Sequence, residues 1–236
     1  IYSFIGFLSG AILFSLLIFI PFFFQLSKGL SPSHSGIFMV SLTFGIIAGA
    51  WISGVIMSKF GKYKFLPTIG SLILIVGLFG IMKMILIYSE NEIFYILFFL
   101  TLTGLGLGPQ LSVITTIIQN DAPAKQMGVS TSSLILMRQI GGNIFIAIFS
   151  YLFIQKIKIE YFKNQINIEQ SFDIFSLDNL HNFNLSIEDQ LLISEILGKG
   201  FQSIFLYLLI ICFFIFLLSL FGRENKLSKV SHNQKN

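Results

Sequence analysis

The stretch Gly200-Phe-Gln-Ser-Ile-Phe-Leu-Tyr-Leu-Leu-Ile-Ile-Cys-Phe-Phe-Ile-Phe-Leu-Leu-Ser-Leu-Phe-Gly222 contains no charged side chain. A run of about 20 apolar residues is long enough to cross a bilayer core of about 30 Å as a helix. Five further charge-free runs occur, at 1–27, 29–58, 65–82, 93–120 and 139–155. None of them alternates with a period of two, which favours helices over the strands of a barrel. The sequence therefore predicts six membrane-spanning helices, at 2–25, 35–58, 65–88, 93–119, 127–154 and 201–221.

Composition excludes several classes of protein. The 236 residues are 54% hydrophobic and 11% charged, with a mean hydropathy of +0.84, whereas a soluble domain carries roughly 25% charged residues. A soluble enzyme, a disordered chain and a disulfide-stapled domain are excluded, and we expect no enzymatic activity and no cofactor. The net charge of +4 is too small to indicate nucleic acid, and the scattered histidines do not have the spacing of metal ligands. We expect an all-α membrane protein whose first partner is the lipid bilayer.

Connections and charges organise the chain further. We divide it into helices over 1–154, an outer loop over 155–200 with a short amphipathic helix starting after Ser186, a last span over 201–222 and a tail over 223–236. Lysine and arginine favour the cytoplasmic side in short loops. This rule places the loop after the second helix, the loop after the fourth helix and the tail inside, with both termini of the segment cytoplasmic. Because the sequence begins at Ile1 rather than Met and enters an apolar run at once, we interpret the chain as a fragment or as the product of a broken gene.

Arg138 is the most informative single residue. It lies about eleven residues, or roughly 16 Å, into the predicted fifth helix, where an unpaired charge costs at least about 2.5–3.5 kcal/mol. Its side chain is therefore expected to face the bundle interior or a water-filled cavity. Gln139 and Asn143 lie close by in sequence, and Gln110 lies beside a proline in the fourth helix. We predict that these four residues line a substrate or translocation cavity. For Arg138 a purely structural clamp on neighbouring carbonyls is an equal alternative, and for Gln110 a plain interhelical hydrogen bond is the favoured alternative.

Small residues recur at four-residue spacing in two of the predicted helices. The second helix carries Ser41, Gly45, Gly49 and Ser53, and the fourth helix carries Gly104 and Gly108. Such stripes let helix backbones approach closely in a membrane, so static packing is the plainer interpretation and a sliding face the functional one. Glycine beside Pro109 also predicts a kink in the fourth helix, with freed carbonyls that face protein or water.

One absence bears on energy coupling. No Asp or Glu lies inside any of the six predicted spans, whereas proton carriers in transporters are usually embedded carboxylates or histidines. Lys83, by contrast, lies near the end of its span, where its stem reaches the headgroups.

Two stretches carry a resemblance to a known family. The turn between the second and third helices resembles the major facilitator loop signature, with Ser58 standing where that signature has an aspartate. The matching positions are Gly54, Lys59, Gly61, Lys62 and Lys64. The second stretch runs from Gly104-Leu-Gly-Leu-Gly-Pro109 through Gln119-Asn-Asp-Ala-Pro123 and Gly128 to Arg138-Gln-Ile-Gly-Gly142. This pattern resembles the fourteen-span drug:proton antiporters of the EmrB/QacA type, in their last six spans.

The resemblance implies a fold, an activity and partners. The six helices would form one bundle of a major facilitator fold and the C-terminal half of a multidrug efflux antiporter in a bacterial inner membrane. Its energy source would be the proton gradient, with the proton-carrying acids mainly in the missing N-terminal half. A small hydrophobic compound would bind at the midplane while the halves rock, and a periplasmic adaptor is a further partner.

Three other interpretations remain at this point. A six-span channel is one, although the Asn-Pro-Ala pairs of aquaporins and the potassium filter sequence are lacking. The membrane half of an ABC exporter is another, although Gly61-Lys62 does not complete a Walker loop. The third is an inert or partner-dependent remnant of a transporter gene.

Overall fold

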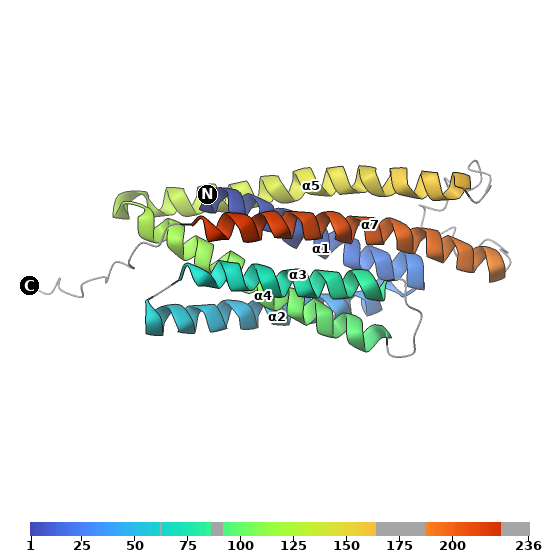
Figure 1. The fold of residues 1–236 in the computed structure, drawn as a ribbon, viewed down its shortest axis with the longest axis horizontal. Coiled ribbons are helices and arrows are strands. Elements are labelled where there is room, and N and C mark those ends of the chain that lie inside the picture. Colours follow the sequence, from blue (N-terminus) through green and yellow to red (C-terminus); the bar gives the residue numbers. More distant parts are fainter. Residues whose placement is uncertain (62, 86–91, 164–186, 223–236) are drawn as a thin grey trace, which may run out of the picture.

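The chain folds as a bundle of long helices. The computed structural model describes residues 1–61, 63–85, 92–163 and 187–222, and within them six helices are long and apolar enough to cross a membrane. The prediction of an all-α membrane protein with six spans is confirmed. The helices are α1 (Tyr2–Lys28), α2 (Pro32–Phe60), α3 (Phe65–Met84), α4 (Glu92–Asp121), α5 (Met127–Lys163) and α7 (Ile187–Leu220), with the short 3-10 helix η1 (Ala124–Gln126) before α5 (Figure 1).

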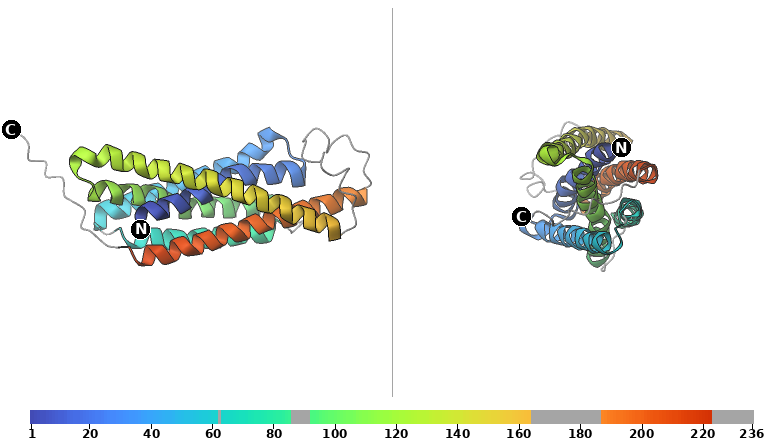
Figure 2. Two further views of the ribbon diagram at one scale, coloured as in Figure 1. Left: turned by 90° about the horizontal axis from the view of Figure 1, so that it is seen from above. Right: turned by 90° about the vertical axis from the view of Figure 1, so that its left-hand side faces the viewer.

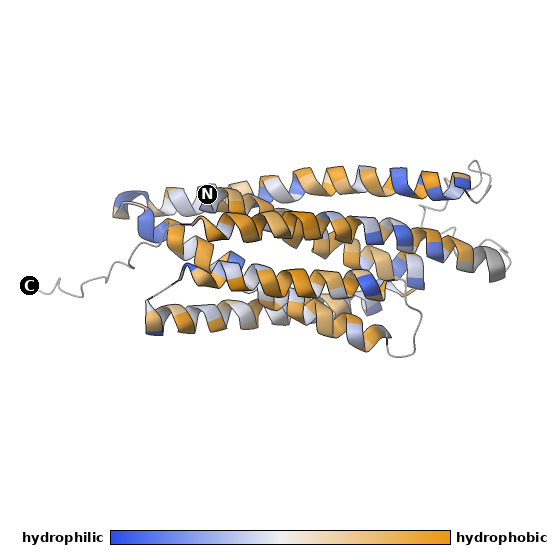
Figure 3. Ribbon diagram, viewed as in Figure 1, coloured by the Kyte–Doolittle hydropathy of each residue, from blue (hydrophilic) through white to orange (hydrophobic). Residues whose placement is uncertain are grey.

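Two glycines set the connections at opposite ends of the bundle. Gly29 ends α1 with a φ of 63° and Gly61 ends α2 with a φ of 65°, a left-handed conformation that glycine adopts without a Cβ penalty. After Gly29, Ser31 caps α2 and Pro32 occupies its first turn. We use the terms Gly29 end and Gly61 end for the two ends of the bundle. Along the bundle, apolar residues dominate the middle of the helices and polar residues gather toward both ends, as a membrane protein requires (Figure 3).

The helices α1 and α4 occupy the centre of the bundle. Helix α1 packs against α5, α7, α4 and α2, while α4 packs against α2, α3, α1 and α5, and α3 also contacts α7. The end-on view of Figure 2 shows this arrangement. The least buried spans are α2 and α5, with 22% and 28% of their apolar windows buried, against 61% in α1 and 56% in α4. These two helices therefore flank the bundle, and each leaves one long face that no other described residue covers.

Glycines bring α2 and α4 into backbone contact. A Cβ at Gly45 would collide with the carbonyl oxygen of Thr101, and one at Gly49 with that of Leu105. From the other side, a Cβ at Gly104 would collide with the carbonyl oxygen of Leu42. Glycine is required at these positions because only Cα–H groups fit against the facing carbonyls, a recurrent weak hydrogen bond at helix crossings. The small-residue stripes thus serve close packing in this structure.

The same contact recurs between α1 and α5, which run in the same direction, as α2 and α4 do. A Cβ at Gly10 would collide with the carbonyl oxygen of Arg138, and one at Gly141 with that of Phe7. The contact of Gly10 with the carbonyl of Arg138 matches that of Gly104 with the carbonyl of Leu42. The contact of Gly141 with the carbonyl of Phe7 matches that of Gly45 with the carbonyl of Thr101. The chain therefore contains an internal repeat in which α1 corresponds to α4, and α2 to α5.

The structure corrects the predicted limits of the loop over 155–200. Helix α5 continues to Lys163, and the expected amphipathic helix is the first part of α7, continuous with the last span. Figure 1 shows both helices projecting past the other helices at the Gly29 end. Residues 164–186, the end of the predicted third span after Ile85 and the tail over 223–236 lie outside the described residues.

Candidate functional site

Arg138 lies on α5 where this helix meets α1 and α4. Its side chain is half-buried, and one Nη donates a hydrogen bond to the backbone carbonyl of Leu111 in α4 at 3.4 Å. Its Nε is buried and has no hydrogen-bond partner in the described part of the chain. The carbonyl of Leu111, two residues beyond Pro109, is the kind of partner that the structural-clamp alternative for Arg138 requires. Gly10 makes this position possible, because a side chain there would meet the backbone and the Cγ of Arg138.

Gln110 is not beside Arg138 but between α4 and α3. Its side chain is fully buried, and its Nε2 donates to the backbone carbonyl of Pro67 at 2.6 Å. Its Oε1 is buried and accepts no hydrogen bond from any residue that the structure describes. The expectation that Gln110 lines a cavity with Arg138 is corrected, because adjacent positions on a helix point about 100° apart and α4 turns Gln110 toward α3. The alternative expected for Gln110, a hydrogen bond between helices, is the one present here. In this structure Gln110 connects two helices.

Gln139 and Asn143 lie on the exposed face of α5. Among the described residues neither side chain has a hydrogen-bond partner, and neither shares the Leu111 contact of Arg138. Their positions correspond, by the internal repeat, to Thr43 and Ile47 on the exposed face of α2. The predicted cavity residues of α5 therefore do not share one site. Arg138 lies beside α1 and α4, whereas Gln139 and Asn143 lie on the exposed face of α5.

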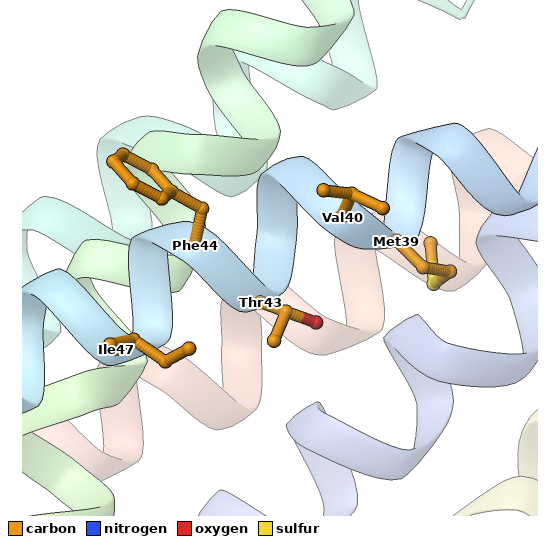
Figure 4. A pocket seen from close by; sticks show the side chains of 5 residues that line it. All are labelled: Met39, Val40, Thr43, Phe44 and Ile47. Carbon is orange, nitrogen blue, oxygen red and sulfur yellow. The ribbon is translucent and has the colours of Figure 1, made fainter.

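The exposed face of α2 forms a shallow apolar groove (Figure 4). All of its lining side chains come from α2 itself: Met39, Val40, Thr43, Phe44 and Ile47. Thr43 is the only polar member, and Val40, Phe44 and Ile47 are each more than 60% exposed. The sequence analysis did not identify this groove, because the hydropathy of a helix does not distinguish a side that faces lipid from a side that packs against protein.

Pro109, where the sequence predicts a kink, lies inside α4. Helix α4 is continuous through Pro109, so the proline does not break it. Proline lacks an amide hydrogen, which leaves the carbonyl of Leu105 without its helical donor. That oxygen faces Gly49 of α2, so the freed carbonyl faces protein as expected. Gly104 and Gly108 pack against α2 and act in helix packing.

The loop signature at the Gly61 end is a tight turn. The amide of Gly61 donates to the carbonyl of Met57 at 3.0 Å, and its positive φ explains the glycine. Tyr63 then folds back, fully buried against Val113 and Ile117 of α4. Lys59 is exposed and Lys64 partly exposed, a Cβ at Gly54 would meet open space, and Lys62 lies outside the described residues.

Two polar features were missed by the sequence analysis. At the Gly61 end, Gln119 of α4 donates to the hydroxyl of Thr131 in α5 at 3.1 Å. At the Gly29 end, the nine-tenths buried carboxylate of Glu160 pairs with Lys156 at 3.4 Å, Lys163 at 3.6 Å and Lys199 of α7 at 3.7 Å. Lys199 also pairs with Glu195 at 2.8 Å. The i,i+4 spacing of Lys156 to Glu160 and of Glu195 to Lys199 was the available signal.

Comparison with known proteins identifies the fold and the family. The model of the family described as Major Facilitator Superfamily matches residues 1–146. The chain belongs to this superfamily. Among solved structures, a bacterial homologue of the human lysosomal transporter Spinster, inward-facing and unoccupied, superimposes with a TM-score of 0.70 over 93% of this chain and 47% of its own, at 17% sequence identity. The expected major facilitator fold is confirmed.

Several curated superfamily members are similar in sequence. The tetracycline resistance determinant of Streptomyces rimosus is 30% identical over 64% of this chain and 43% of its own length. The tetracenomycin C resistance and export protein of Streptomyces glaucescens is 30% identical over 60% of this chain and 26% of its own. The multidrug transporter protein MdtP of Bacillus subtilis is 30% identical over 59% and 25%. The chain thus spans less than half the length of these transporters, and it is a multi-pass membrane protein of the same superfamily.

Proposed function

We propose that residues 1–236 form the C-terminal six-helix bundle of a proton-coupled efflux transporter of the fourteen-span EmrB/QacA type. Its substrate would be a small hydrophobic compound, exported by alternating access between two bundles. Support comes from superfamily membership and from relatives that are named for drug resistance and export. Each of these relatives is more than twice as long as the part that this chain covers.

The unpartnered faces of α2 and α5 are the observation that carries the proposal. These faces correspond to each other by the internal repeat, and they lie on either side of the central helices α1 and α4. A surface that packs against a second bundle is expected to have this arrangement. Thr43 on α2, and Gln139 and Asn143 on α5, place polar groups on these faces, which hydrocarbon would not solvate. A second bundle packed on both helices would enclose the site at Arg138.

Proton coupling is assigned to the missing half. In the described helices the acidic residues lie toward the ends, with Glu160 and Glu195 at the Gly29 end and Asp121 at the Gly61 end. The described middle of this bundle has no carboxylate that could carry a proton across. We assign the Gly61 end to the cytoplasm of a bacterial cell, and a periplasmic adaptor would meet the projecting ends of α5 and α7.

Reconstitution tests the proposal. The full-length transporter is placed in liposomes whose interior is more acidic than the medium. Uptake of tetracycline into these liposomes is compared with its uptake into liposomes that hold residues 1–236 alone. We expect gradient-dependent uptake and matching proton efflux with the full-length protein only. Coupled transport by residues 1–236 alone would contradict the half-transporter assignment, and uptake that ignores the gradient would contradict proton coupling.

A further inference from the structure

The guanidinium of Arg138 is poorly satisfied within the described protein. It has five N–H donors, and its one hydrogen bond is the 3.4 Å contact to the carbonyl of Leu111. Within the described part of the chain no carboxylate pairs with it, and its Nε is shielded from solvent without an acceptor. A buried donor without an acceptor is costly, so an additional acceptor at this position would be bound favourably.

The carbonyl of Leu111 is itself already occupied. It lies in the interior of α4, where it accepts the helical amide of Thr115. It also accepts the hydroxyl of Thr115 at 2.6 Å. A carbonyl oxygen has two lone pairs, so Arg138 competes for a saturated acceptor, which accounts for its long contact. Arg138 is thus held in place by its backbone at Gly10 while its charged end lacks a strong partner.

The surroundings of Arg138 favour an aromatic ligand. Toward α1, Phe14 packs against Gly142, one turn beyond Arg138, and Phe7 packs edge-on against Phe145 at 6.0 Å between ring centroids. The hydroxyls of Ser112 and Thr115 line the adjacent turn of α4, half-exposed. Aromatic side chains of α1 and α5 thus lie one and two turns from Arg138, and together with its planar guanidinium they suit a flat molecule with an anionic edge.

From these contacts we infer that Arg138 binds an anionic, delocalised oxygen pair of the transported compound, either a carboxylate or an enolate. The planar guanidinium matches such a pair with two parallel hydrogen bonds, which a lysine does not reproduce. With no described carboxylate facing it, the site repels lipophilic cations and selects aromatic acids. This inference rests on the proposed function, because it requires that a substrate reaches the face between the two bundles.

Equilibrium binding to the purified full-length transporter tests the inference without transport. The probes are two matched pairs, 2-naphthoate with 2-naphthamide and salicylate with salicylamide, which differ chiefly in the charged oxygen pair. The variants are Arg138→Gln and Arg138→Lys. The control is Lys83→Gln, which removes a cation that lies over the Phe79 ring on α3.

The expected result has three parts. The wild type binds each acid more tightly than its amide. Arg138→Gln raises the Kd of the acids at least about tenfold and leaves that of the amides unchanged, with Arg138→Lys intermediate. Lys83→Gln changes neither Kd.

Two results would overturn the inference. One is equal affinity for acid and amide in the wild type, and the other is an Arg138→Gln variant that loses both probes equally. Tetracycline transport by the wild type is measured in parallel. Failure of that transport would contradict the proposed function, whereas absence of charge selectivity in an active transporter would contradict only the role of Arg138.

Discussion

The backbone carbonyl of Arg138 in α5 lies against Gly10 of α1, so closely that a Cβ at position 10 would collide with it. The residue that carries the charge of the site therefore also takes part in the close crossing of these two helices. Its Cγ is part of the same contact, so the first part of the side chain is fixed while the guanidinium reaches Leu111. The repeat places Leu42 of α2 against Gly104 of α4 in the same way, without a charge.

Replacing Gly10 by alanine should push α1 and α5 apart. Backbone atoms cannot yield as a flexible side chain would, so we expect a loss of about 1–3 kcal/mol from overpacking. Thermal unfolding in detergent measures this loss. Gly36→Ala is the matched control, because a Cβ there meets nothing within 4 Å and alanine favours the helix. A Gly10→Ala variant as stable as Gly36→Ala would show that the crossing is not tight.

Gln110→Leu should change stability little and leave transport intact. The substitution removes the bond to Pro67, but it also removes the unpartnered Oε1, so we expect a change within about 1 kcal/mol. The measurement is unfolding of the variant together with tetracycline transport by the full-length protein. A severe transport defect in a stable Gln110→Leu variant would restore the cavity role that the sequence suggested.

Glu160→Gln should loosen the joined ends of α5 and α7. The substitution leaves Lys156, Lys163 and Lys199 near one another without their shared carboxylate, so we expect a loss of about 1 kcal/mol or more. Glu195→Gln, which removes a more exposed acid with one partner, should cost less than about 1 kcal/mol. Chemical unfolding at low and high salt measures both losses. Equal effects of the two variants would argue against a central role for Glu160.

The proposed orientation predicts the accessibility of the two ends. Cys212 is the single cysteine of residues 1–236 and is buried, so labelling uses the full-length transporter with Cys212→Ala and with every cysteine outside these residues also replaced. In intact cells a membrane-impermeant maleimide should label Lys163→Cys and should label Lys125→Cys only after the membrane is opened. The reverse pattern would place the Gly61 end outside.

The sequence predicted the spans well because the free energy of placing a helix in lipid depends mainly on charge and length. It misplaced the ends of α5 and α7 because Lys156, Glu160 and Glu195 were interpreted as loop residues. In the structure these charges pair along and between the helices, which removes the reason to end a helix there.

The site was predicted only in part for a geometric reason. The need of Arg138 for a carbonyl follows from its charge in a membrane helix, and sequence suffices for that expectation. The direction in which Gln110 points depends on the rotation of α4 against α3. The exposure of Gln139 and Asn143 depends on which helices flank the bundle. Neither the rotation of α4 nor the choice of flanking helices can be read from the spacing of residues along one helix.

Spin-label accessibility tests the central claim, that the exposed faces of α2 and α5 receive a second bundle. Labels are placed in the full-length transporter at Thr43 on α2 and at Gln139 on α5, which the repeat relates. Control labels are placed at Val76 on α3 and Phe213 on α7, which are 55% and 53% exposed. Molecular oxygen dissolved in the bilayer should relax the control labels strongly and the labels at 43 and 139 weakly. If all four labels are equally accessible to oxygen, α2 and α5 face lipid, and the half-transporter account is wrong.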